Sequence, residues 1–160
     1  LKANELSKQR KDTEAIKKYR KALELLNAKE PVLIAKAYLG LGNARDDDNP
    51  SNNSSYWFHK ALEFLTEKDA VILAKTYLGL GNAKDRNNVY NHSSYWYLLV
   101  IDLLEASELT NLLAQANYGL GNLNRIERKL EKAKYYYEEV LKYNNKYPLC
   151  QAALNILNNK

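Results

Sequence analysis

Apolar residues recur along the chain at the three- and four-residue spacing of an α-helix, and polar stretches interrupt them at regular intervals. In residues 31–45, for example, Ala35, Leu39 and Gly42 share one helical face. Stretches such as 84–94 are rich in Asn, Asp and Ser, which is typical of turns. No segment shows the two-residue alternation of a strand. The pattern therefore predicts an all-α protein.

Local start signals place the predicted helices. Pro31 suits the first turn of a helix, and Asp69 suits an N-cap. Pro148 precedes a last helical pattern. With boundaries uncertain by about two to four residues, we expect helices near 2–10, 13–27, 31–45, 52–66, 70–85, 91–105, 108–126, 130–144 and 148–158.

The chain repeats itself. Gly42 and Gly81 lie 39 residues apart, and Gly81 and Gly121 lie 40 apart; "NSSYWFHKAL" also returns as "HSSYWYLLVI" and, more loosely, as "KAKYYYEEVL". A fixed period of this size indicates stacked units that bury their apolar sides against neighbours. We expect one domain over 1–160, a piece of a longer chain, with an incomplete leading unit 1–30, units 31–68, 69–106 and 107–145, and a capping helix 146–160.

The most conspicuous repeated motif is "YLGLGNA", at 38–44 and 77–83. Two glycines before a polar residue can form a phosphate-binding loop, but such a loop needs a preceding strand and unused backbone N–H groups. Gly40 and Gly42 lie within a helical pattern instead. We therefore expect the glycines to be structural, making room for a neighbouring helix at a cost of about 1 kcal/mol each relative to alanine.

These landmarks resemble the tetratricopeptide repeat. Leu-Gly pairs fill its first-helix positions, and a small–aromatic–small triplet fills its second-helix positions. The resemblance implies a right-handed α-solenoid of helix-turn-helix units with a C-terminal capping helix. The matching pairs are Leu41-Gly42, Leu80-Gly81 and Leu120-Gly121, and the triplets are Ala15, Tyr19, Ala22; Ser54, Phe58, Ala61; Ser93, Tyr97, Val100; and Ala133, Tyr137, Val140.

Two departures distinguish this chain from the usual repeat. The period is 39–40 residues where the familiar repeat has about 34, and the proline after the second helix is missing in the middle units. The longer period is similar to that of kinesin light chains and of polarity adaptors of the spindle. Both departures affect the expected superhelical pitch more than the fold.

The resemblance implies that first helices line a concave peptide-binding groove. Asn43, Asn82 and Asn122 form its sharpest feature, because an amide can pair with the backbone of any bound peptide. The alternative is that these amides bind water or neighbouring helices. The groove residues implied are Lys36, Leu39, Asn43 and Asp46 or Asp47; Lys75, Leu78, Asn82 and Asp85 or Arg86; and Gln115, Tyr118, Asn122 and Arg125.

Pairs of aromatic residues recur on the second helices. One interpretation is that their rings pack between units and cover the seams between helices. The other is an exposed aromatic surface for self-association or a second partner. The pairs are Tyr56 and Trp57, Tyr95 and Trp96, and Tyr135 and Tyr136.

Charge narrows the partner class. The net charge is +5, distributed as +4 over 1–30, −3 over 31–123 and +4 over 124–160. Basic ends around a slightly acidic middle do not form one continuous stripe, so nucleic acid is less favoured than protein. We see no signal peptide or membrane span, and the single Cys150 indicates a reducing, cytoplasmic setting.

Catalytic chemistry finds little support. His59 and His92 occupy unrelated positions, and the acidic run 46–48 lacks the pattern of a calcium loop. We therefore expect no enzyme activity, cofactor, metal or small-molecule substrate. The preferred function is a scaffold that binds a peptide segment of another protein. Self-association and, more weakly, RNA binding through the basic termini are the alternatives.

Overall fold

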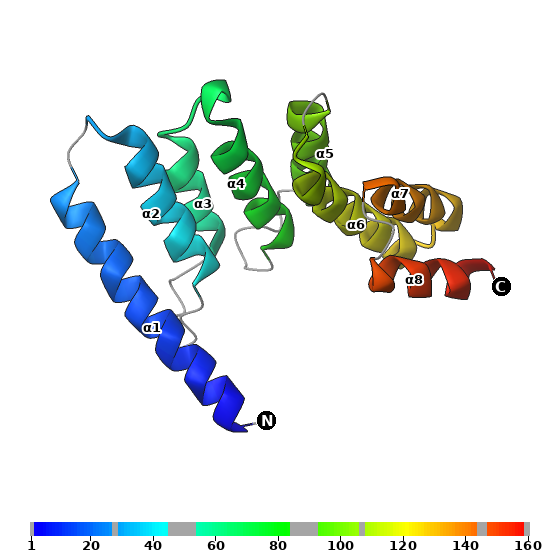
Figure 1. Ribbon diagram of the computed structural model, residues 1–160, viewed down its shortest axis with the longest axis horizontal. Coiled ribbons are helices and arrows are strands. Elements are labelled where there is room, and N and C mark those ends of the chain that lie inside the picture. The colour runs from blue at the N-terminus through cyan, green and yellow to red at the C-terminus, as the bar shows by residue number, and fades with distance from the viewer. Residues whose placement is uncertain are drawn as a thin grey trace. The chain divides into compact units, whose positions relative to one another are not determined.

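The computed structural model describes residues 2–26, 29–44, 54–83, 93–105, 108–143 and 147–158, and for residues 2–10 and 148 it describes the backbone alone. All regular structure in these ranges is helical, which confirms the all-α prediction for the described residues (Figure 1). The elements are α1 (Lys2–Leu25), α2 (Pro31–Asn43), α3 (Ser54–Leu62), the 3-10 helix η1 (Glu67–Asp69), α4 (Ala70–Asn82), α5 (Ser93–Leu104), α6 (Thr110–Ile126), α7 (Leu130–Tyr143) and α8 (Pro148–Asn158).

Two predicted boundaries are wrong. The expected break between residues 10 and 13 does not occur, because α1 runs without interruption through Lys11 and Asp12 and contains no Gly or Pro. The expected helix 52–66 ends at Leu62, since a capping box takes over after it. There the Thr66 backbone N–H donates to Asp69 Oδ2 at 3.1 Å and caps the start of η1.

Contacts divide the chain into two compact units, Leu1–Asn91 and His92–Lys160, here called unit 1 and unit 2. In unit 1, α1 packs on α2, α2 on α3 and α3 on α4, and α2 also contacts α4. In unit 2, α5 packs on α6, α6 on α7 and α7 on α8. Each helix thus packs mainly against its neighbours along the chain, as in a helical repeat array.

Each unit has its own core. In unit 1, Ile16 of α1 and Leu41 of α2 are buried together with Ala44, and Tyr19 and Leu23 pack against them. In unit 2 the buried cluster joins three consecutive helices and includes the only cysteine. Its members are Ala114, Ala133, Tyr137, Val140, Cys150 and Leu154. Small residues at the helix contacts let large rings fill the space between helices.

Candidate functional site

In unit 1, the glycines of the repeated motif lie against aromatic rings. A side chain at Gly40 would meet the ring of Tyr19, and one at Gly42 or Gly79 would meet the ring of Phe58. A Cβ atom at Gly79 would lie only 2.6 Å from Phe58 Cζ, closer than real Cβ atoms come. The ring of Phe58 is therefore held between two glycines, one on α2 and one on α4.

Unit 2 repeats the arrangement with tyrosines. Gly119 of α6 lies against the ring of Tyr97 of α5, and Gly121 lies against the ring of Tyr137 of α7. These glycines are helical and none has a positive φ, so their N–H groups belong to helices and not to a phosphate-binding loop. The structural interpretation of the glycines is confirmed at all five positions.

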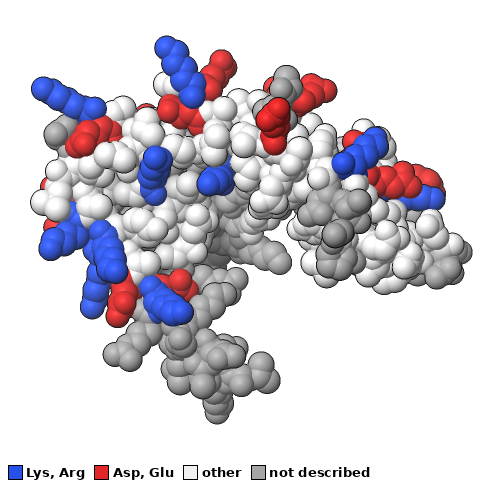
Figure 2. All heavy atoms as spheres, in the orientation of Figure 1, with Lys and Arg blue, Asp and Glu red and all other residues white. Residues whose placement is uncertain are grey.

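The packing of α2 on α4 brings equivalent polar residues onto adjacent helices. Lys36 and Asn43 of α2 are exposed, and so are Lys75 and Asn82 at the same positions of α4. Each lysine is the only charged residue of its helix. Figure 2 shows a surface over α2 and α4 that is largely without charge, whereas Lys and Arg side chains gather along α1.

The leucines predicted between these polar residues lie elsewhere. Leu39 and Leu78 are only 9% and 4% exposed, so their side chains belong to the core of unit 1 and offer little surface to a ligand. The expectation that they add apolar contacts to a groove is not met. Both helices have several neighbours, since α2 packs on α1, α3 and α4 and α4 packs on α2, α3 and η1, so a wide face of each helix is covered.

In unit 2 the corresponding residues have different surroundings. Gln115 and Arg125 are exposed, and Tyr118 is half-buried between the rings of Tyr137 and Tyr147, with centroids 6.1 and 5.4 Å away. Asn122 is also half-buried, and its Oδ1 accepts a hydrogen bond of 2.8 Å from the Tyr137 hydroxyl. This amide is therefore already part of the internal packing of unit 2.

Burial and a neighbouring charge shift the pKa of the Tyr137 hydroxyl in opposite directions. Burial raises its pKa, and the neighbouring Arg125 guanidinium partly offsets that rise. The side chain stays protonated at neutral pH and donates to Asn122. Four predicted groove residues, Asp46, Asp47, Asp85 and Arg86, lie outside the described residues.

The aromatic pairs of α3, α5 and α7 divide in the same way each time. The first ring is exposed: Tyr56, Tyr95 and Tyr135 have 47%, 56% and 56% of their surface accessible. The second ring packs inward: Trp57 and Tyr136 are half-buried and Trp96 is buried. In each pair the two rings meet edge-on, with centroids between 4.9 and 5.2 Å apart. In each pair, therefore, one ring packs inward and the other faces outward; a role of the outward rings in self-association or partner binding stays a prediction.

Sequence reasoning missed three buried polar residues, Ser55 of α3, Thr76 of α4 and Asn117 of α6. Thr76 of α4 and Asn117 of α6 each bond back to a carbonyl one helical turn earlier, at 2.8 and 2.9 Å, and so need no ligand. Their helical positions alone could not reveal this burial, because it depends on which neighbouring helix covers them.

The remaining candidate chemistry is sparse. Cys150 is buried, and burial raises the pKa of its thiol to about 11. His59 is exposed, and His92 lies outside the described residues. Within the described ranges, no group of three or more His, Cys, Asp or Glu side chains could hold a metal ion. None of the helices described is both long and apolar enough to cross a membrane.

Comparisons of the chain with protein-family models, with curated proteins and with solved structures find no match. The assignment of a function therefore rests on the residues and the packing described above.

Proposed function

We propose that the protein is a non-catalytic scaffold of the tetratricopeptide type, a right-handed solenoid that binds a peptide segment of a partner protein through its first helices. The observation that carries the proposal is the repetition of exposed Lys36 and Asn43 on α2 as Lys75 and Asn82 on the adjacent α4. Because the same polar groups lie at equivalent positions of adjacent helices, they suit a ligand whose hydrogen-bonding groups repeat at regular intervals.

A peptide backbone is such a ligand. Packed helices lie about 8–10 Å apart, and an extended chain advances about 3.3 Å per residue. A peptide crossing α2 and α4 would therefore meet equivalent side chains about every third residue. An asparagine amide both donates and accepts, so it can pair with the backbone whatever the peptide's side chains are. Gln115 provides an amide on α6 at the position that Lys36 and Lys75 occupy.

The test begins with peptides selected from a random 12-residue library on the immobilised full chain. The dissociation constant of a selected peptide is then measured by calorimetry for the wild type and for Asn43→Ala/Asn82→Ala. Two lost hydrogen bonds of about 0.5–1.5 kcal/mol each should weaken binding by about tenfold or more. Circular dichroism should show unchanged helicity, since both residues are exposed at helix ends.

The matched control is Asn155→Ala/Asn158→Ala, which removes two exposed amides from α8. Its affinity should equal that of the wild type. Equal affinity of the Asn43→Ala/Asn82→Ala variant for every selected peptide would sink the proposal.

Self-association is a second candidate function, favoured by the exposed tyrosines of α3, α5 and α7. Tyr56, Tyr95 and Tyr135 occupy equivalent positions, and each is about half accessible. A second copy could cover these rings. Light scattering across concentration decides the matter: a dimer that dissociates on Tyr95→Ser/Tyr135→Ser supports this function, and a monomer at every concentration rejects it.

A further inference from the structure

Helices α1, α3, α5 and α7 carry the same small–aromatic–small triplet, but α1 buries it less. In α3, Ser54 is half-buried, but Phe58 and Ala61 are only 3% and 0% exposed. In α7 the residues of the triplet, Ala133, Tyr137 and Val140, are fully buried. The equivalent residues of α1, Ala15, Tyr19 and Ala22, are each only half-buried. A face that is covered elsewhere in the molecule is thus partly open on α1.

The rings show which side of α1 is open. Phe58 is contacted by Gly42 from the helix before it and by Gly79 from the helix after it. Tyr19 is contacted by Gly40, from the helix that follows α1. The position that corresponds to Gly42, on the other side of the ring, would belong to a helix preceding α1 in the packing order.

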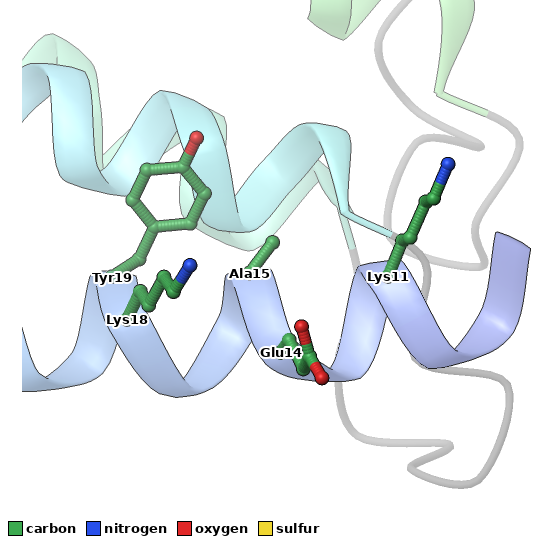
Figure 3. Close-up of a pocket in the computed structure, with 5 residues that line it drawn as sticks. All are labelled: Lys11, Glu14, Ala15, Lys18 and Tyr19. Atoms are coloured by element: carbon green, nitrogen blue, oxygen red, sulfur yellow. The ribbon is translucent and has the colours of Figure 1, made fainter.

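A hollow of about 350 Å³ lies at this place, and the described residues that line it all come from α1. Figure 3 shows Lys11, Ala15 and Tyr19 pointing to the same side of the helix, with Glu14 and Lys18 beside them. The floor is a small residue and an aromatic ring. The two lysines are exposed, so the rim carries more positive than negative charge.

The α2–α3 pair shows how a helix would fit. Gly42 lies one residue from the end of α2, its partner Phe58 lies at the middle of α3, and the chain that leaves α2 enters α3 at Ser54. The chain that follows such a glycine therefore runs toward the start of the second helix. On α1, that direction leads from Tyr19 toward Lys11.

We propose that this face of α1 is a docking surface for an amphipathic helix of a partner protein, one that sets a glycine against the Tyr19 ring and carries acidic residues after it. The glycine allows the close approach seen at Phe58. The acidic residues complement Lys11 and Lys18. The surface lies on α1 and uses none of the residues assigned to peptide binding on α2 and α4.

The chain's own sequence supplies the probe. A synthetic peptide of residues 31–48, PVLIAKAYLGLGNARDDD, has the required glycine at Gly42 followed by three aspartates. Fluorescence anisotropy of the labelled peptide with the full 160-residue chain should show saturable binding with a dissociation constant below about 1 mM. The same peptide with Gly42→Leu should bind at least about tenfold more weakly, because its side chain would overlap the ring.

Two charge-reversal variants of the chain locate the site. Lys11→Glu/Lys18→Glu changes the rim, whereas Lys17→Glu/Lys21→Glu makes the same charge change at exposed positions of α1 outside it. At about 50 mM salt the first should raise the dissociation constant by about fivefold or more and the second by less than twofold. Ala15→Arg should abolish binding by filling the hollow, with helicity checked by circular dichroism.

Four results would overturn the proposal. The first is no saturable binding of the peptide below about 1 mM. The second is equal weakening by the two charge-reversal variants, which would indicate non-specific attraction. The third is a wild-type dimer that dissociates on Ala15→Arg, which would make this face a contact between copies of the chain. The variant Asn43→Ala/Asn82→Ala should bind the peptide as the wild type does; weaker binding would move the peptide to α2 and α4 and reject the α1 site.

Discussion

The asparagine that follows the second glycine of the repeated motif has different surroundings in the two units. In unit 1, Asn43 is the last residue of α2 and is exposed. Gly42 beside it faces the ring of Phe58, which has no hydroxyl. In unit 2, Asn122 accepts a hydrogen bond from Tyr137, and α6 continues to Ile126. One position of the motif therefore serves an outward surface in one unit and internal packing in the other.

The difference comes from the facing ring. Phe58 and Tyr137 fill the same packing role against Gly42 and Gly121. Only the tyrosine carries a donor, and a buried hydroxyl needs an acceptor. The asparagines at this position of the repeated motif therefore do not all have the same surroundings. The exposed amide of Asn43 is a better candidate for binding a partner than the amide of Asn122, whose oxygen already accepts a hydrogen bond.

The largest expected effect is a loss of stability when the glycine–aromatic packing that both units share is disrupted. Gly42→Leu and Gly121→Leu should each destabilise the protein by about 2–3 kcal/mol, because the new side chain would displace a buried ring. Lys36→Leu, at an exposed position of the same helix as Gly42, should change stability by less than about 0.5 kcal/mol. Denaturant unfolding measures all three, and a Gly42→Leu variant as stable as the wild type would contradict the assigned contact with Phe58.

A double-mutant cycle tests the difference between the units. Tyr137→Phe and Asn122→Ala should each cost about 1 kcal/mol, and the double variant should cost less than their sum, since both remove one hydrogen bond. Asn43→Ala should leave the free energy of unfolding within about 0.5 kcal/mol of the wild type. Strict additivity in the cycle would show that the hydroxyl and the amide are not coupled.

A substitution just after α6 should instead increase stability, by a smaller amount. Arg128, just beyond the C-cap, has a φ of 60°, a left-handed conformation that glycine adopts more easily. Arg128→Gly should therefore stabilise the protein by about 0.5–1 kcal/mol. The exposed Lys132→Gly, inside α7, should instead destabilise it by about 1 kcal/mol. Thermal unfolding distinguishes the two, and a loss of stability in both would contradict the assigned conformation of Arg128.

The smallest expected effect is a dependence on alkaline pH. Burial raises the pKa of Tyr97 to about 12 and also raises that of Tyr137. A raised pKa of a tyrosine means that the folded state favours the protonated hydroxyl. The stabilisation is complete below the ordinary value of about 10 and is lost as the pH rises toward about 12.

At about pH 10.5 the loss for one such group is below about 1 kcal/mol. Denaturant unfolding at about pH 8 and 10.5 should show this loss in the wild type and a smaller one in Tyr97→Phe. Phe58, in the same position of unit 1, does not ionise, so Phe58→Tyr should increase the loss. Equal pH dependence in all three proteins would contradict the role of buried hydroxyls.

Several features could be read from the sequence because they depend on residues near one another in the chain. Turn-rich stretches and apolar spacing placed all eight described helices, and missed only the continuity of α1 and the early end of α3. The period of 39–40 residues predicted that the glycines make room for a neighbouring helix, since a costly residue repeated once per unit indicates a packing need. That the space is filled by aromatic rings came from the structure. The exposed lysine and asparagine of α2 and α4 also followed from register.

Other features required the tertiary structure. Leu39 and Leu78 are buried in unit 1, where α2 and α4 each pack on several other elements, and nothing within either helix reveals that burial. The same holds for the hydrogen bond between Asn122 and Tyr137, two residues 15 apart in the chain, and for which ring of each aromatic pair faces outward. The sequence by itself determined the helices and their repetition, because hydrophobic spacing and turn residues act locally. Only the packing of helix on helix decided which side chains remain at the surface, because burial depends on neighbours that are distant along the chain.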